Sequence, residues 1–214
     1  MFGIFNDNFP PVLDGVALTA QNYAYWLHAK GHEVRVITDY APKMQEVIKA
    51  APYPINFVPS VPIPFRYPYR YGLPYASPAF MHNFRKMQFE LVHAHCPFVT
   101  GYLAYAAAQK QQIPLVATFH SKYRQDFEHN VHSKRIVDAM VRMIIRFFNK
   151  ADEVWIPQAA VEPTLREYGY AGHVEVVENG NDFYTPSPQI DAMRAEMRGE
   201  LGMAPEDMML LFVG

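Results

Sequence analysis

The chain has 214 residues, half of them hydrophobic, and a formal net charge of −2 at pH 7. This length suffices to bury one substantial core, and the weak charge, with no basic run longer than two residues, argues against a nucleic-acid partner. The single cysteine, Cys96, excludes an internal disulfide, and the N-terminus does not resemble a secretory signal, so we expect a cytoplasmic location.

The first predicted elements alternate between strand and helix. The apolar run FGIF, residues 2–5, predicts a short buried strand. From residue 16 to residue 30 apolar side chains recur at helical spacing, and Gly31 follows as a C-cap, which predicts a helix. The alternating stretch EVRVIT, residues 33–38, then predicts a second strand.

The segment of residues 51–80 differs, because it holds eight of the 18 prolines and five tyrosines. Proline fixes φ and removes a hydrogen-bond donor, so most of this segment should lack regular structure. Its side chains could bind an acceptor or an interface, or the rings could pack on their own domain. The candidates for binding are Arg66, Tyr67, Tyr69, Arg70 and Tyr71.

Strand and helix signals alternate again over residues 91–179. LVHAH and LVATF predict strands at 91–95 and 115–119, with a helix over 101–112 between them. Ser133 can cap a helix that runs to about Lys150, and EVWIP, residues 153–157, predicts another strand. A short helix over 162–168 ends at Gly169, and VEVVEN, residues 174–179, predicts the last strand.

This alternation predicts the fold class. Strands separated by helices need crossover connections, which are right-handed and place helices on both faces of a parallel sheet. We therefore predict an α/β fold, a doubly wound, mostly parallel Rossmann-like sheet. Ligands of such sheets bind outside the carboxyl ends of the strands. There the chain has polar, aromatic and glycine-containing segments: NDNFPPVLDG, HAHCPF, HSKYRQD, PQ and NGND.

The loop after the first strand ends at Gly15, where a helix is predicted to begin. Free backbone N–H groups and the positive end of a helix dipole would make this junction an anion site. Alternatively, Gly15 is a turn glycine that only lets the chain enter the helix. The motifs GxGxxG and GK[ST] are absent, which disfavours an NAD enzyme and an NTPase.

Two further patterns allow more than one interpretation. His93 and His95 share one face of a strand, a spacing that also suits a metal, but the structural interpretation is preferred and we predict no metal site. The helix over 134–150 has a basic face of Arg135, Arg142, Arg146 and Lys150 opposite an apolar face. Such a helix could lie on anionic lipid, but a core helix with a solvated face is favoured. No apolar window is long enough to span a bilayer.

Five motifs occur together along the chain: DNFPPVLDGV, VHAHCPF with Gly101, TFHSKY, ADEVWIPQ and VEVVENGND. In this order and at about these separations they resemble glycosyltransferase family 4, from Phe2 to Gly214. The stretch TFHSKYRQDFEH is similar to the diacylglycerol glucosyltransferase branch. The resemblance implies a GT-B fold, in which one Rossmann-like domain holds mainly the acceptor and a second holds mainly the nucleotide-sugar donor.

The resemblance covers only the first of those two domains. It implies an N-terminal acceptor-side domain over residues 1–185, with a linker helix and the first strand of a C-terminal donor-binding domain over 186–214, where the chain ends in MMLLFVG. The residues that grip the donor diphosphate in relatives are not present. The chain is therefore expected to need its own C-terminal domain as a partner and to be inactive alone.

The resemblance also assigns roles to residues. His120 matches a histidine that contacts the transferred sugar, Gly15 matches a glycine at the donor diphosphate, and Asp126 is a candidate acceptor base. Asp14 stands where many relatives have a second glycine, so its carboxylate either faces an acceptor hydroxyl or weakens the donor-site interpretation. The other implied donor or acceptor contacts are Val16, His95, Pro97, Ser121, Tyr123, Asn179 and Gly180.

The implied reaction is retaining transfer of a hexose from a nucleotide sugar to a lipid or polysaccharide acceptor. Front-face transfer needs no protein nucleophile, so the chain would contribute positioning and electrostatics. The nucleotide sugar is a substrate, no cofactor is expected, and peripheral contact with the inner membrane face would suit a lipid acceptor. The alternative is a non-catalytic Rossmann-like module that binds a sugar or a nucleotide, while Asp14 keeps an inverting or epimerase-type GT-B enzyme open.

Overall fold

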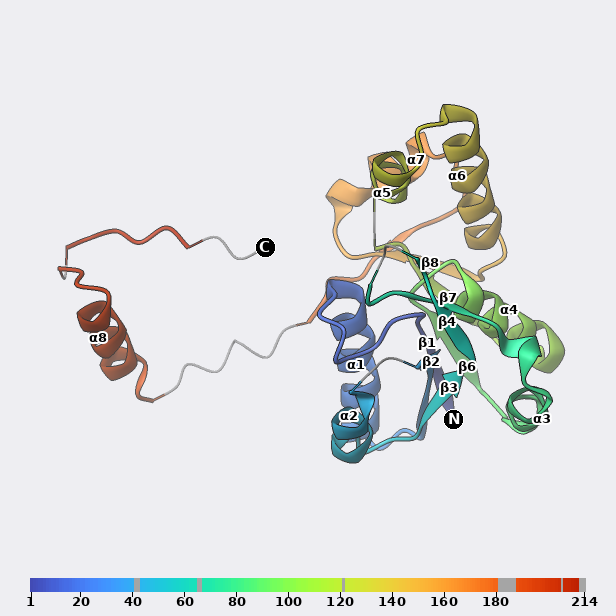
Figure 1. Ribbon diagram of the computed structural model, residues 1–214, viewed down its shortest axis with the longest axis horizontal. Coiled ribbons are helices and arrows are strands. Elements are labelled where there is room, and N and C mark those ends of the chain that lie inside the picture. The colour runs from blue at the N-terminus through green and yellow to red at the C-terminus, as the bar shows by residue number, and fades with distance from the viewer. Residues whose placement is uncertain (41–42, 65–66, 121, 181–187, 205, 212–214) are drawn as a thin grey trace. The chain divides into compact units, whose positions relative to one another are not determined.

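In this computed structural model a parallel sheet with the strand order β3-β2-β1-β6-β7-β8-β9 forms the middle layer of residues 1–179 (Figure 1). The structure describes residues 1–40, 43–64, 67–120, 122–180, 188–204 and 206–211. The sheet strands are β1 (Phe2–Phe5), β2 (Val34–Asp39), β3 (Ile55–Val58), β6 (Leu91–Ala94), β7 (Leu115–Thr118), β8 (Glu153–Ile156) and β9 (Glu175–Val176). All of their pairings are parallel, which confirms the predicted sheet.

Helices flank the sheet on both faces, as predicted for a doubly wound fold (Figure 1). In the first part of the chain they are α1 (Gly15–Ala29), α2 (Met44–Ala50), α3 (Pro78–Lys86), α4 (Val99–Gln111), α5 (Tyr123–Asn130), α6 (Lys134–Phe148) and α7 (Glu162–Glu167), with 3-10 turns η1 (Pro74–Ala76) and η2 (Ala159–Val161). Gly31 follows α1 with φ +88°, the left-handed conformation expected at a C-cap. Ser133 is the N-cap residue of α6, but its side chain makes no capping bond.

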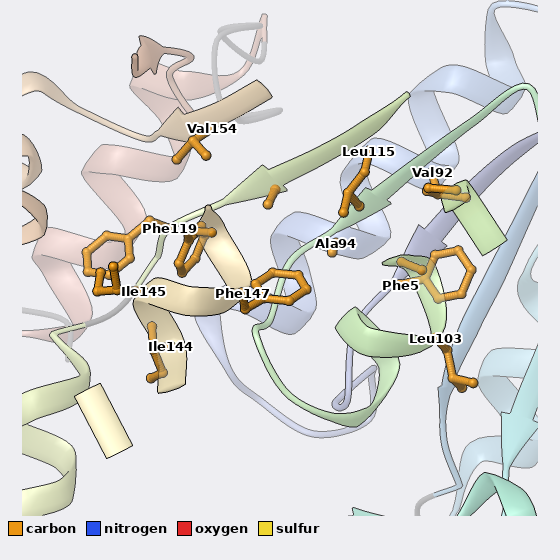
Figure 2. Packing of buried hydrophobic residues seen from close by; sticks show 14 of the residues in the cluster. Phe5, Val92, Ala94, Leu103, Leu115, Phe119, Ile144, Ile145, Phe147 and Val154 are labelled. Carbon is orange, nitrogen blue, oxygen red and sulfur yellow. The ribbon is translucent and has the colours of Figure 1, made fainter. Parts of the chain in front are cut away.

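The core has two parts, because side chains alternate between the faces of each strand. Ile4 and Val36 pack with α1 and α2 on one face, whereas Phe5 packs on the other. Figure 2 shows the larger cluster, in which Phe5, Leu115 and Phe147 are among the buried side chains. The apolar side of α6 packs into this cluster, as predicted for a core helix, and its basic face remains exposed. Among the described helices, none has the length and apolar character needed to cross a bilayer.

The proline-rich segment is more regular than predicted. Its residues form β3, the antiparallel pair β4 (Ser60–Pro62) and β5 (Arg70–Gly72), and η1. The prolines are tolerated because the strands are short and β3 lies at an edge of the sheet, where Pro54 and Pro59 flank it without interrupting it. The stretch HSKYRQD likewise becomes helical at Tyr123, where α5 begins.

The chain divides into two compact units, Met1–Asn179 and Gly180–Gly214. The second unit contains α8 (Ile190–Glu200). The expected strand at MMLLFVG is not formed over its described residues, 208–211, and residues 212–214 lie outside the described part of the chain.

The sheet order places the site. From β1 the chain adds β2 and β3 on one side, and it then returns to add β6, β7, β8 and β9 on the other. The strands next to β1 are therefore β2 and β6, with Phe2 opposite both Val34 and Leu91. Such a reversal of strand order opens a crevice at the carboxyl ends of the strands, where α/β proteins bind ligands.

Candidate functional site

A cleft of about 600 Å³ lies at this carboxyl edge of the sheet, within the first unit. Its walls come from the loops after β1 and β6, from the β4–β5 hairpin, and from α5 and α6. The lining residues are Asn6, Asp7, Asn8, Asp14, Val16, Ile63, Tyr69, Arg70, Tyr71, Gly72, His95, Cys96, Phe98, Val99, Tyr123, Asp126, Phe127, Met140 and Met143.

Three histidines meet where β6 and β7 end. The rings of His93 and His95 lie 4.0 Å apart between centroids, and His95 Nδ1 is 3.1 Å from His120 Nε2. Burial lowers the pKa of His93 to about 3 and that of His120 to about 4, and it holds the pKa of His95 well below its ordinary value. All three imidazoles are therefore neutral at pH 7 and act as hydrogen-bonding groups, not as cations.

The contacts around this cluster favour one tautomer of His120. Of the two neutral rings, one must donate in the pair His95 Nδ1 and His120 Nε2. His95 Nε2 is buried and has no partner among the described residues. A buried acceptor without a partner is less rare than a buried donor without one. This favours a hydrogen on His95 Nδ1, which donates to His120 and leaves the hydrogen of His120 on Nδ1.

Packing fixes the orientation of these rings. Tyr23 of α1 lies with its ring centroid 5.0 Å from that of His93 and 5.3 Å from that of His95. Trp155 of β8 packs edge to face on His93, and Thr118 Oγ1 lies 2.7 Å from His93 Nε2. Tyr23, Trp155 and Thr118 thus restrict the rings of His93 and His95. The hydrogen bond from His95 in turn fixes the orientation of the His120 ring.

Two carboxyl groups at the cleft were not predicted: Asp7 is half-buried and lines the cleft, and Asp39 is buried. Asp7 follows β1 and its Oδ1 accepts from the Thr100 N–H at 2.9 Å, so it caps α4 from 93 residues away. Asp39 ends β2, and its two carboxyl oxygens are buried without a partner among the described residues. The sequence feature that could have revealed this pair is an aspartate at or just after the end of each of the first two strands.

Burial governs the ionisation of this pair. It raises the pKa of Asp39 to about 8, and the nearby Asp7 adds to the rise, while Arg70 opposes it. Burial also raises the pKa of Asp7. Arg70 is held by the hairpin, with its Nε 2.9 Å from Ser60 Oγ. Asp39 therefore keeps a proton at neutral pH, because ionisation of a buried carboxyl group is costly and a second carboxyl group nearby adds to that cost.

The start of α1 lies at the cleft, as the anion-site hypothesis requires. Asp14 and Val16 line the cleft, and Gly15 between them is exposed. A Cβ added to Gly15 would meet no atom within 4 Å, so the backbone there is open to approach. Asp14 Oδ1 accepts from the Val16 N–H at 2.8 Å, so a carboxylate already takes one of the free donors of this helix start.

The other predicted site residues are placed as follows. Tyr123 and Asp126 line the cleft from α5, and Pro97 lines an adjacent apolar pocket. Asn179 and Gly180 are exposed and line neither cavity; the division between the two units falls between them. Ser121 lies outside the described residues, as does Arg66 of the aromatic segment.

The structure thus brings Asp14, Val16, His95, Tyr123 and Asp126 together in one cleft. His120 is not a lining residue, but it contacts the lining residue His95. Within the described part of the chain, no three His, Cys, Asp or Glu side chains group in a way that could hold a metal ion.

Comparisons with known proteins identify a family and relatives of this chain. A family model described as Glycosyltransferase Family 4 matches residues 13–183. An alpha-monoglucosyldiacylglycerol synthase from Acholeplasma laidlawii is 34% identical over 129 residues, which cover 60% of this chain and 31% of the relative. A Streptococcus pneumoniae enzyme of the same name is 25% identical over 214 residues, which cover 98% of this chain and 47% of the relative. The chain thus spans less than half of the length of both.

A solved structure supports the fold. The crystal structure of Anabaena HepE in complex with UDP and glucose has a TM-score of 0.63 with this chain at 17% identity. The match covers 94% of this chain and 50% of that one.

Proposed function

The chain belongs to glycosyltransferase family 4, and on this premise we propose that it forms the acceptor-side part of an enzyme that transfers a hexose from a nucleotide sugar to a lipid hydroxyl group. The proposal concerns the whole protein, of which the chain corresponds to less than half by comparison with the curated relatives. The observation that carries it is the cleft at the carboxyl edge of the sheet, where five of the predicted site residues lie together.

The substrate classes follow from the relatives. Both reported curated relatives carry the name of a glycolipid synthase, which supports a diacylglycerol-type acceptor over a polysaccharide. The HepE structure holds UDP and glucose, which supports a nucleotide-sugar donor. The names do not favour a non-catalytic binding module, because they describe enzymes that build a glycosidic bond. We expect the donor to be gripped mainly by the C-terminal domain that family members have.

For the reaction we propose front-face transfer with retention. The acceptor oxygen bonds to the anomeric carbon, the bond from that carbon to the diphosphate breaks, and the acceptor proton passes to the leaving diphosphate. The names of the relatives specify an alpha product, which retains the configuration of an α-linked nucleotide sugar. In this mechanism the protein positions the reactants and stabilises the charge that develops in the transition state, and no protein nucleophile is needed.

Within this reaction His120 would bind the transferred sugar as a neutral hydrogen-bond donor. Its lowered pKa keeps it uncharged at pH 7, and His95 holds its ring. Asp126 is exposed at the cleft and would face the acceptor hydroxyl. Asp14 caps α1, which gives its carboxylate a structural role and weighs against an inverting mechanism that uses it as the base.

The test is a transfer assay on the complete gene product with UDP- and GDP-hexoses and diacylglycerol acceptors, followed by mass detection of the glycolipid. His120→Ala should lower kcat by about a hundredfold or more, the usual cost of removing a group that stabilises the transition state. His129→Ala, at an exposed histidine of α5, is the matched control and should leave kcat unchanged. Unchanged kinetics in His120→Ala would remove that residue from the mechanism.

An assay of the 214-residue chain alone tests whether the donor is bound by the expected C-terminal domain and not by this chain. Without the expected donor grip it should show no turnover and only very weak binding of nucleotide sugars in calorimetry. Micromolar binding would place the donor site within this chain and contradict the assignment of the donor to the C-terminal domain.

A lipid acceptor also suggests where the protein works. We propose a cytoplasmic protein that contacts the inner membrane face peripherally. The exposed side chains of Arg135, Arg142, Arg146 and Lys150 on and next to α6 support this, because clustered basic side chains attract anionic lipid.

A further inference from the structure

A second cavity, an apolar pocket of about 470 Å³, adjoins the cleft. Its walls come from β5, from η1, from the start of α4 and from α6. Five residues line both cavities, so the two share a wall: Tyr71, Gly72, Phe98, Val99 and Met143. The pocket therefore lies next to the cleft in which the acceptor hydroxyl is proposed to react.

Among the described residues that line this pocket, none has a charged side chain. Several of its large apolar side chains are nevertheless open to water: Leu73 is 38% exposed, Tyr102 37% and Tyr75 75%. Apolar side chains that gather around a concavity and remain exposed usually mark a binding site. The cleft beside it also has many apolar lining residues, but it differs from the pocket in adding carboxyl, guanidinium and imidazole groups.

The pocket is built from ordered contacts. Gly72 packs so closely on α4 that an added Cβ would lie 2.8 Å from Val99 Cγ1. Arg70 ties the two strands of the hairpin together through its Nη2, 2.7 Å from the Ser60 carbonyl oxygen. Tyr102 packs on the core residue Phe147, with ring centroids 5.4 Å apart. A cavity with preformed walls binds an apolar ligand with little cost for ordering side chains.

Resting on the proposed function, we propose that this pocket binds an acyl chain of the lipid acceptor while the cleft holds its headgroup hydroxyl. A diacylglycerol joins an uncharged apolar chain to a small polar head, and here an uncharged pocket lies beside a cleft that holds ionisable groups. An alkyl chain loses no hydrogen bonds when it enters such a pocket, whereas the many hydroxyl groups of a polysaccharide would lose their hydrogen bonds to water there. The inference therefore narrows the acceptor class and makes the acyl chain a determinant of specificity.

The test compares two diacylglycerol acceptors with the same head, one with palmitoyl and one with butyryl chains, in detergent micelles with the complete gene product. The double variant Leu73→Gln, Tyr75→Gln changes side chains that line only the apolar pocket. The control is Leu18→Gln, Tyr25→Gln, which changes the same residue types at exposed positions of α1 that line neither cavity.

In the double pocket variant kcat/KM for the palmitoyl acceptor should fall by about tenfold, because an amide replaces apolar contact with the chain. For the butyryl acceptor it should stay within about twofold, which also shows that the variant is folded and active. An equal change for both acceptors, no change for either, or the same loss in the α1 control would overturn the acyl pocket. Absence of transfer to any lipid by the unmodified protein would instead refute the proposed function and, with it, this inference.

Discussion

Replacing Asp39 with asparagine should stabilise the protein at neutral and mildly alkaline pH. The Asp39 side chain is 3% exposed, and its oxygens find no hydrogen-bond partner among the described residues. The backbone of the hairpin covers it, since a Cβ on Gly72 would lie 2.9 Å from Asp39 Oδ1. Burial, with Asp7 nearby, raises the pKa of this carboxyl group from 3.8 to about 8.

A raised folded-state pKa costs stability as the pH increases. Below pH 4 both the folded and the unfolded chain hold the proton, so the contribution of Asp39 is fully present there. Between pH 4 and pH 8 the unfolded chain releases the proton while the folded chain must keep it. The loss is about 1.4 kcal/mol for each pH unit above the unfolded pKa, or about 4 kcal/mol at pH 7. Asparagine is neutral at every pH and should avoid this loss.

Urea unfolding of the 214-residue chain from pH 4 to pH 8.5, followed by circular dichroism, measures the effect. The free energy of unfolding of the unmodified chain should fall across this range relative to that of Asp39→Asn, with near equality at pH 4. Asp126→Asn makes the same substitution at an exposed position of the same cleft and should change the free energy of unfolding at pH 8 by less than about 0.5 kcal/mol. If Asp39→Asn is less stable than the unmodified chain at pH 8, Asp39 is ionised in the folded protein and the reasoning fails.

The remaining predictions concern Gly101, Gly15 and the basic face of α6. Gly101→Ala should lower the free energy of unfolding by about 1 to 3 kcal/mol in urea, because its Cβ would collide with the Cys96 carbonyl oxygen and this outweighs the gain in helix propensity. Gly15→Ala, which meets open space, should change that free energy by less than about 0.5 kcal/mol; a loss as large as at Gly101 would contradict the geometry. In vesicle co-sedimentation of the complete gene product, Arg142→Glu with Arg146→Glu should weaken binding to anionic lipid, at about 1 kcal/mol per basic residue, and equal binding would exclude α6 as the contact.

Local patterns in the sequence were sufficient for the fold class and the family. The runs at Phe2–Phe5, Leu91–Ala94 and Leu115–Thr118 are apolar because both faces of a parallel strand are buried, so each can be recognised without its neighbours. Motifs of polar residues after such runs carried the resemblance to the family. The prediction failed over residues 51–80, because proline propensity alone does not reveal that an edge strand such as β3 needs few ladder bonds.

The site itself needed the tertiary structure. The sequence placed His95 and His120 each at a strand end, but their 3.1 Å contact exists only because β6 and β7 pair in this register. Likewise Asp7 and Asp39 come near each other only because β1 pairs with β2, and Asp39 is buried because the hairpin covers it.

What the sequence by itself determined was most of the strands of the parallel sheet, the order of the chemistry-bearing residues and the family, because these depend on neighbours along the chain. The adjacency of the uncharged pocket and the cleft with its ionisable groups was decided only by the folded chain. Their walls join residues 71–76 of the hairpin region, the start of α4 and Met143 of α6, which are far apart in sequence. Burial also decides the protonation of Asp39 and the histidines, since a pKa responds to the charges and solvent that packing brings near or removes.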